Sequence, residues 1–137
     1  MRKVLTVTIL AGLLALITAA PFAADKPQAN CPVSGHAVDK KVYVDYQGQR
    51  VYFCCDKCPA KFKADPEKYF AQFVKEGIVL ENVQVTCPVS GEDIDKKAFT
   101  DYKGRRVYFC CSKCIAKFQK DPEAFLKKLP GQKEPSK

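Results

Sequence analysis

Residues 50–58 read Arg-Val-Tyr-Phe-Cys-Cys-Asp-Lys-Cys, and residues 106–114 read Arg-Val-Tyr-Phe-Cys-Cys-Ser-Lys-Cys. The first four residues of each run include aromatic and β-branched side chains, which favour a strand. After the paired cysteines the pattern changes to helical spacing, and Pro59 is compatible with the first turn of a helix. We therefore expect these cysteines to lie where a strand ends and a helix begins, once in each copy.

The repeat extends in both directions at a constant offset of 56 residues. Upstream, Cys-Pro-Val-Ser-Gly occurs at residues 31–35 and again at 87–91, and downstream Asp-Pro-Glu occurs at 65–67 and again at 121–123. No insertion interrupts the register, which indicates a tandem duplication. The predicted organisation is a first module at 29–76, a linker at 77–86, a second module at 87–129 and a polar tail at 130–137.

Each module has the pattern of a small α+β unit. The stretches 42–46 and 49–53 are separated by Gln47 and Gly48, which predicts a hairpin whose turn uses the positive φ of glycine. Lys103-Gly104 has the same place in the second copy. Asp65, followed by a proline and a glutamate, is typical of the N-cap of a second helix. The expected core aromatic residues are Phe53, Phe62, Tyr69 and Phe70.

The chain begins with Arg2 and Lys3, followed by an uncharged apolar run over 4–20 and small residues up to Ala24. This pattern predicts a secretory signal peptide at residues 1–24, hence a periplasmic or secreted protein, and the run is short for a membrane anchor. Without the leader, 21 basic and 15 acidic side chains give a net charge of +6. They are scattered along the chain, so we expect no nucleic-acid partner, and membrane contact only through an uncleaved leader.

The eight cysteines all lie outside the predicted leader. The exported protein is therefore expected to carry all of them in a compartment that permits disulfides. A module of this size needs a staple, because domains below about 40 to 70 residues bury little apolar surface. At the start of a helix, Cys54 with Cys58 (i, i+4) and Cys55 with Cys58 (i, i+3) each place two sulfur atoms on one face. Either pair can chelate a metal, and the spacing leaves the choice open.

The Cys-Pro-Val-Ser-Gly motif, the aromatic hairpin ending in Tyr-Phe-Cys-Cys and the following Cys resemble the YHS domain and the related TRASH domain. The resemblance implies small cysteine-rich modules of treble-clef type, with a knuckle, a β-hairpin and helices. It also implies heavy-metal trafficking, sequestration, sensing or resistance, and a metal transporter or another exported metal protein as partner. The ligands that it implies are Cys31, Cys54, Cys58, Cys87, Cys110 and Cys114, with Cys55, Cys111 and His36 as additional candidates.

Ser34 and Ser90 stand where a complete zinc knuckle would offer a further cysteine. Structural zinc sites close with four Cys or His ligands, so three thiolates with an open position are expected instead. Such a soft site suits Cu(I) as well as Zn(II), and the bound heavy-metal ion is expected to be one of these. We interpret the two serines themselves as hydrogen-bonding residues of a turn.

The cysteine pattern also permits two other functions. Cys55-Asp56-Lys57-Cys58 is a C-x-x-C sequence at a helix start, which is also typical of thiol-disulfide redox proteins. Alternatively, disulfides such as Cys31 to Cys58 would hold a metal-free interaction module together. Hydrolase or transferase chemistry is not expected, because a chain with one histidine offers no duplicated acid-base pair. We therefore expect a binding protein and not an enzyme.

Overall fold

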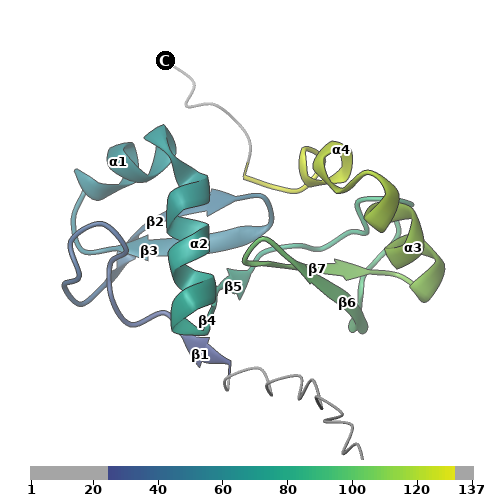
Figure 1. The fold of residues 1–137 in the computed structure, drawn as a ribbon, viewed down its shortest axis with the longest axis horizontal. Helices are drawn as coiled ribbons and strands as arrows, with labels where there is room; N and C mark the ends of the chain where they lie inside the picture. Colours follow the sequence, from purple (N-terminus) through teal and green to yellow (C-terminus); the bar gives the residue numbers. More distant parts are fainter. Residues whose placement is uncertain (1–24, 132–137) are drawn as a thin grey trace, which may run out of the picture.

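The computed structural model describes residues 25–131, so the predicted leader lies outside the described residues. Within this range no helix is long and apolar enough to cross a membrane. The elements are β1 (Lys26–Pro27), β2 (Asp39–Tyr46), β3 (Gln49–Phe53), α1 (Cys58–Ala64), α2 (Pro66–Glu76), β4 (Ile78–Val79), β5 (Glu81–Asn82), β6 (Asp95–Tyr102), β7 (Arg105–Phe109), α3 (Ser112–Lys120) and α4 (Pro122–Leu126). Figure 1 shows two similar α+β units side by side, as the repeat predicts.

The predicted hairpins are confirmed. Strands β2 and β3 pair antiparallel, as do β6 and β7 in the second module. Both residues of each turn have positive φ, 47° and 78° at Gln47 and Gly48, and 46° and 80° at Lys103 and Gly104. Positive φ at both central positions characterises the type I′ turn, whose twist matches that of paired strands. The sequence pattern predicted this conformation for the glycines alone.

The predicted helix starts are also confirmed. Helix α1 begins at Cys58 with Pro59 in its first turn. Asp65 is the N-cap of α2, where its carboxylate accepts a hydrogen bond from the backbone N–H of Lys68 at 3.3 Å. Asp121 caps α4 in the same way. The local sequence therefore sets the beginning of each second helix.

Each module has its own hydrophobic core between its hairpin and its helices. In the first module Phe53 and Phe62 are 0% exposed, with ring centroids 5.6 Å apart. Phe70 is also buried, whereas the predicted core residue Tyr69 is only partly buried and packs at the margin of this cluster. The second core is built around the corresponding Phe109 and Phe118. The first and last cysteines of each module belong to these cores, so the core holds them in place.

The segment 77–86, expected as a linker, is part of the fold. Strand β4 pairs in parallel with β1, and β5 pairs antiparallel with β3. Between them Leu80 is 4% exposed and belongs to the first core. The connection therefore fixes the path of the chain between the modules.

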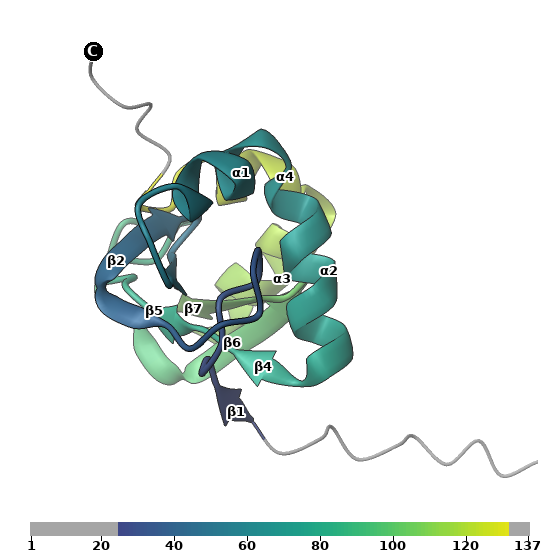
Figure 2. The same cartoon turned by 90° about the vertical axis from the view of Figure 1, so that its left-hand side faces the viewer.

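The two modules contact each other through their hairpin turns. The backbone N–H of Gly48 donates to the carbonyl of Pro130 at 2.8 Å, and Gly48 lies against the side chain of Leu129. In return, Gly104 lies against Phe70 and Val74 of α2. Figure 2 shows the modules one behind the other, with α1 and α4 at the same edge. Each hairpin turn thus packs on the other module.

Candidate metal centres

A tight turn positions the first cysteine of each module. The backbone N–H of Gly35 donates to the carbonyl of Cys31 at 2.8 Å, and Gly35 has a φ of 76°. The N–H of Cys31 donates in turn to the carbonyl of His36. The same two bonds recur around Cys87. This knuckle leaves the thiol of Cys31 buried at the edge of the core.

The three cysteines of each module that the family resemblance implies as ligands converge. The Sγ atoms of Cys31, Cys54 and Cys58 all lie within 4.8 Å of one another. Cys54 follows β3 directly and Cys58 begins α1, and their Sγ atoms are 3.8 Å apart. The predicted approach of knuckle, strand end and helix start is confirmed, and it selects Cys54 over Cys55 as the partner of Cys31.

The second module repeats this arrangement. Its three Sγ atoms, on Cys87, Cys110 and Cys114, lie within 4.8 Å of one another, and those of Cys110 and Cys114 are 3.6 Å apart. Sulfur ligands 2.3 Å from a tetrahedral zinc ion are about 3.8 Å apart. The thiol spacing therefore fits a metal ion in either cluster. Figure 1 shows that α1 and α3, which carry Cys58 and Cys114, lie at opposite ends of the molecule.

Ser34 and Ser90 lie beside these thiols. The Oγ of Ser34 is 3.0 Å from the Sγ of Cys54, and the Oγ of Ser90 is 3.2 Å from the Sγ of Cys110. Ser90 also accepts a turn hydrogen bond from the N–H of Glu92 at 3.4 Å. The turn role expected from the sequence is thus only part of their function. The serine hydroxyls contact the cluster, where a hydrogen bond stabilises a thiolate.

The thiols of one cluster differ in acidity. Burial raises the pKa of Cys31, but hydrogen bonds from the Ser34 hydroxyl and from backbone N–H groups outweigh it and bring the pKa down to about 7. Burial, followed by the hydrogen bonds of the neighbouring thiols, raises the pKa of Cys58 to about 12. Cys87 and Cys114 behave in the same way. Each cluster therefore holds one thiol that is partly ionised at neutral pH and one thiol that retains its proton until a cation offsets the accumulated negative charge.

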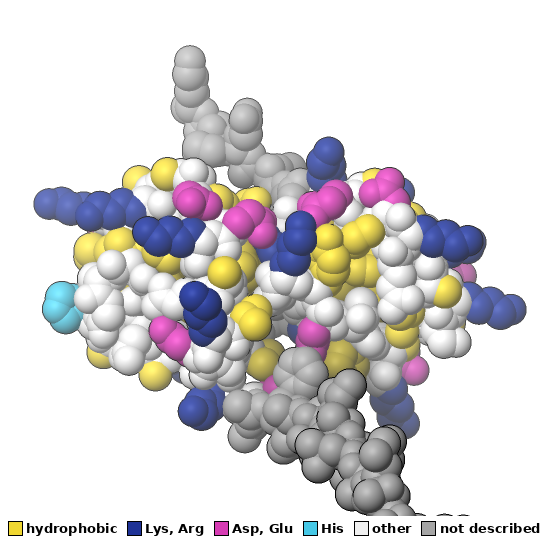
Figure 3. Space-filling model, in the orientation of Figure 1, with side chains coloured by type: hydrophobic (Ala, Val, Ile, Leu, Met, Phe, Trp, Pro, Cys, Tyr) yellow, Lys and Arg dark blue, Asp and Glu magenta, His cyan; other side chains and the backbone are white. Residues whose placement is uncertain are grey.

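The additional candidates occupy different positions. Cys55 and Cys111 are exposed, yet their Sγ atoms lie 3.5 Å from Cys58 and 3.7 Å from Cys114, respectively. His36 is exposed, and its side chain belongs to neither group of ligand atoms within the described chain. Figure 3 shows this histidine, in cyan, protruding at one edge of the molecule. The structure thus brings the extra cysteines to the clusters, but not His36.

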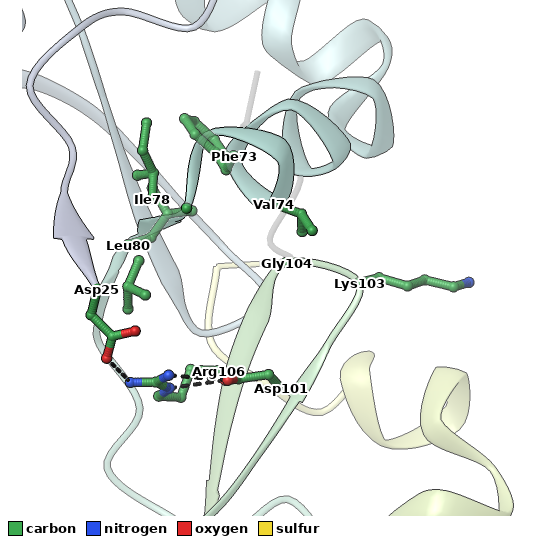
Figure 4. Close-up of a pocket in the computed structure, with 11 residues that line it drawn as sticks. Asp25, Phe73, Val74, Ile78, Leu80, Asp101, Lys103, Gly104 and Arg106 are labelled. Carbon is green, nitrogen blue, oxygen red and sulfur yellow. Dashed lines mark hydrogen bonds and ion pairs between the residues drawn. The ribbon is translucent and has the colours of Figure 1, made fainter. Parts of the chain in front are cut away.

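The cavity between the modules is a poorer candidate site. It measures about 250 Å³ and is lined mainly by apolar residues such as Phe73 and Leu80. The guanidinium of Arg106, which lines the cavity, donates hydrogen bonds to the carboxylates of Asp101 and Asp25 at 2.8 to 3.0 Å (Figure 4). Because these charges are paired with each other, the guanidinium and the two carboxylates are less available to a ligand. The cysteine clusters are therefore the chemically active part of the described chain.

Comparison with known proteins gives one match. The model of the YHS domain family matches the chain twice, over residues 29–72 and 85–128. No curated protein and no solved structure matches the chain significantly. The two matched ranges contain all eight cysteines and agree closely with the modules expected from the repeat.

Proposed function

The chain belongs to the YHS domain family, with two such domains in tandem, and on that premise we propose that it binds heavy-metal ions through its two cysteine clusters. The observation that carries the proposal is the convergence of three thiols within 4.8 Å in each module. The thiols come from separate elements, and the cysteines belong to or pack against the hydrophobic cores, which hold them in place. We propose that each cluster holds its own ion, since the elements that carry them lie at opposite ends of the molecule.

The donor set indicates the class of ion. Thiolate is a soft ligand that selects Cu(I) and Zn(II) over Mg²⁺ or Ca²⁺, which require oxygen ligands. The ligand groups of both clusters consist of cysteine thiols only. The single histidine lies outside both groups, and the single methionine is Met1. The three thiolates of each cluster leave a fourth tetrahedral position open to a further ligand, whereas closed structural zinc sites have four protein ligands. We propose Cu(I) or Zn(II) as the cargo.

An incompletely closed site supports a role in transfer. A thiolate from another protein can bind at the free position before a ligand of this chain leaves, so the ion never has to be released to water. We propose that the protein carries or sequesters its ion outside the cytoplasm, after export through the leader at 1–24. The fitting partner is a metal transporter or another exported protein with thiolate ligands. The proposal concerns a binding protein and not an enzyme.

Native mass spectrometry of the mature protein, purified without an affinity tag, tests the proposal. We expect up to two ions of Cu(I) or Zn(II) per chain after reconstitution under reducing conditions. Cys31→Ser and Cys87→Ser should each weaken the binding of one ion, and the double variant the binding of both. Ser136→Ala, a change in the polar tail, is the matched control. A reduced wild-type chain that takes up neither ion would contradict the proposal. A chain isolated with disulfides within each C-x-x-C would favour thiol-disulfide chemistry instead.

A further inference from the structure

Each module contains a fourth thiol that the three-cysteine cluster leaves out. Cys111 is exposed, whereas Cys87 of the same module is 2% exposed. The Sγ atom of Cys111 lies 3.8 Å from that of Cys110 and 3.7 Å from that of Cys114. The Sγ atoms of Cys110 and Cys114 are themselves 3.6 Å apart. Cys111 therefore completes a second group of three thiols, as compact as the first.

The two groups have two of their three thiols in common. We call Cys87, Cys110 and Cys114 the inner triad, and Cys111, Cys110 and Cys114 the outer triad. Both use the same pair of thiols and differ only in the third, which is buried in the inner triad and exposed in the outer one. The sulfur spacing of the outer triad also matches the separation of about 3.8 Å around a four-coordinate ion. An ion thus has two adjacent positions that differ in access to solvent.

We propose that the outer triad is where an ion is taken up and released, and that the ion moves between the outer and inner triads by exchange of one thiolate. The inference rests on the proposed function and adds a route to it. Cys111 binds the incoming ion together with Cys110 and Cys114. Cys87 then replaces Cys111 while the shared pair keeps hold of the ion, and release follows the reverse order.

The exchange balances without any other reactant. As the thiolate of Cys87 binds the ion, one metal–sulfur bond forms. As Cys111 leaves, one metal–sulfur bond breaks and Cys111 departs as a thiolate. The number of thiolate ligands and the oxidation state of the ion are the same before and after. The step therefore needs no oxidant or reductant.

The first module carries a similar arrangement. Cys55 is exposed and lies 3.5 Å from Cys58, the buried thiol that begins α1. Cys58 is in turn 3.8 Å from Cys54. Because Cys55 follows Cys54 directly in the chain, the exposed thiol is placed by the same turn that places the cluster. The two modules allow the inference to be tested twice within one molecule.

The test uses full-length mature protein loaded with Cu(I) and, separately, with Zn(II), under anaerobic reducing conditions. A chromophoric chelator withdraws the ion, and both the rate and the final extent of withdrawal are recorded. Cys55→Ser and Cys111→Ser should change the extent of withdrawal less than Cys31→Ser and Cys87→Ser do. The rate of withdrawal from the altered module should fall by about tenfold or more. The variant loses a thiolate that belongs to the same chain and therefore assists release at an effective concentration of about mM.

Matched variants separate this route from a simple ligand role. Cys31→Ser and Cys87→Ser should increase the extent of withdrawal, because they remove the buried ligand. If Cys111→Ser weakens binding as much as Cys87→Ser does, the site holds its ion with four thiolates together and the inference is overturned. Withdrawal from Cys55→Ser and Cys111→Ser at the wild-type rate would overturn it as well. Wild-type protein that binds neither ion would instead contradict the proposed function.

Discussion

Arg105 of the second module forms an ion pair with Glu67 of the first. The side chain of Arg105 is 0% exposed, and its guanidinium also lies 3.9 Å from the ring centroid of Phe70. It donates a further hydrogen bond to the carbonyl of Lys103 at 2.9 Å. Glu67 lies in the first turn of α2, at the contact between the modules. A buried cation of one module is therefore neutralised by the other.

Glu67→Ala should destabilise the protein by about 1 to 2 kcal/mol, because the buried guanidinium of Arg105 loses its carboxylate partner, while the 56% exposure of Glu67 keeps the loss below that of a fully buried pair. The matched control is Glu123→Ala at the corresponding position, where the carboxylate pairs with Lys103 and both side chains are 55% exposed. Exposed pairs contribute about 0.5 kcal/mol. Urea unfolding of the reduced protein measures both. Equal losses for the two variants would show that the ion pair between the modules is not stabilising.

Gly104→Ala should destabilise the protein more than Gly91→Ala. Both glycines have a φ of 80°, so alanine loses a similar amount of backbone free energy at each position, about 1 to 2 kcal/mol. A Cβ at Gly91 would meet nothing within 4 Å, whereas one at Gly104 would lie 2.8 Å from the carbonyl oxygen of Phe70. Displacing that backbone should add roughly 1 to 3 kcal/mol. Similar unfolding midpoints for the two variants would argue against close packing of the turn on α2.

Alkylation at pH 7 should follow the exposure and acidity of the thiols in the metal-free, reduced protein. A hydrogen bond from the backbone N–H of Lys57 lowers the pKa of exposed Cys55, so more of this thiol is ionised at neutral pH than in a free cysteine. Burial raises the pKa of Cys58 to about 12, so this thiol stays protonated until the pH rises far above neutral or the module unfolds. Iodoacetamide labelling followed by peptide mass spectrometry should therefore modify Cys55 first and Cys58 last. Equal rates at the two positions would be inconsistent with this geometry.

Metal binding should raise the thermal midpoint, because an ion that binds only the folded state stabilises it. At a free ion concentration one hundred times the dissociation constant, the gain is about 2.7 kcal/mol. A chelator should reverse the shift, and the Cys31→Ser, Cys87→Ser double variant should show a smaller one. Differential scanning calorimetry checks this. A reduced apo protein that melts at the same temperature as the loaded one would show that core packing alone sustains the fold.

Sequence patterns predicted the features that depend on neighbouring residues. The Gly48 turn, the Asp65 N-cap and the strand end at Phe53 each follow from the backbone preferences of a few adjacent side chains. The three cysteines of a cluster were expected through the family resemblance, since their spacing alone left Cys54 and Cys55 equivalent. The contact of Ser34 with Cys54 went beyond the turn role expected from the sequence, because it joins groups on separate elements.

The sequence by itself determined the duplication, the order of knuckle, hairpin and helices in each module, and the presence of thiols at their junctions, because these are written in local periodicity and in the repeat. Only the tertiary structure decided that the segment 77–86 forms strands, that the thiol of Cys111 lies beside that of Cys114, and that Arg105 pairs with Glu67. Arg105 and Glu67 are 38 positions apart and belong to different modules. No local preference relates such residues, and their contact arises only when two complete cores pack against each other.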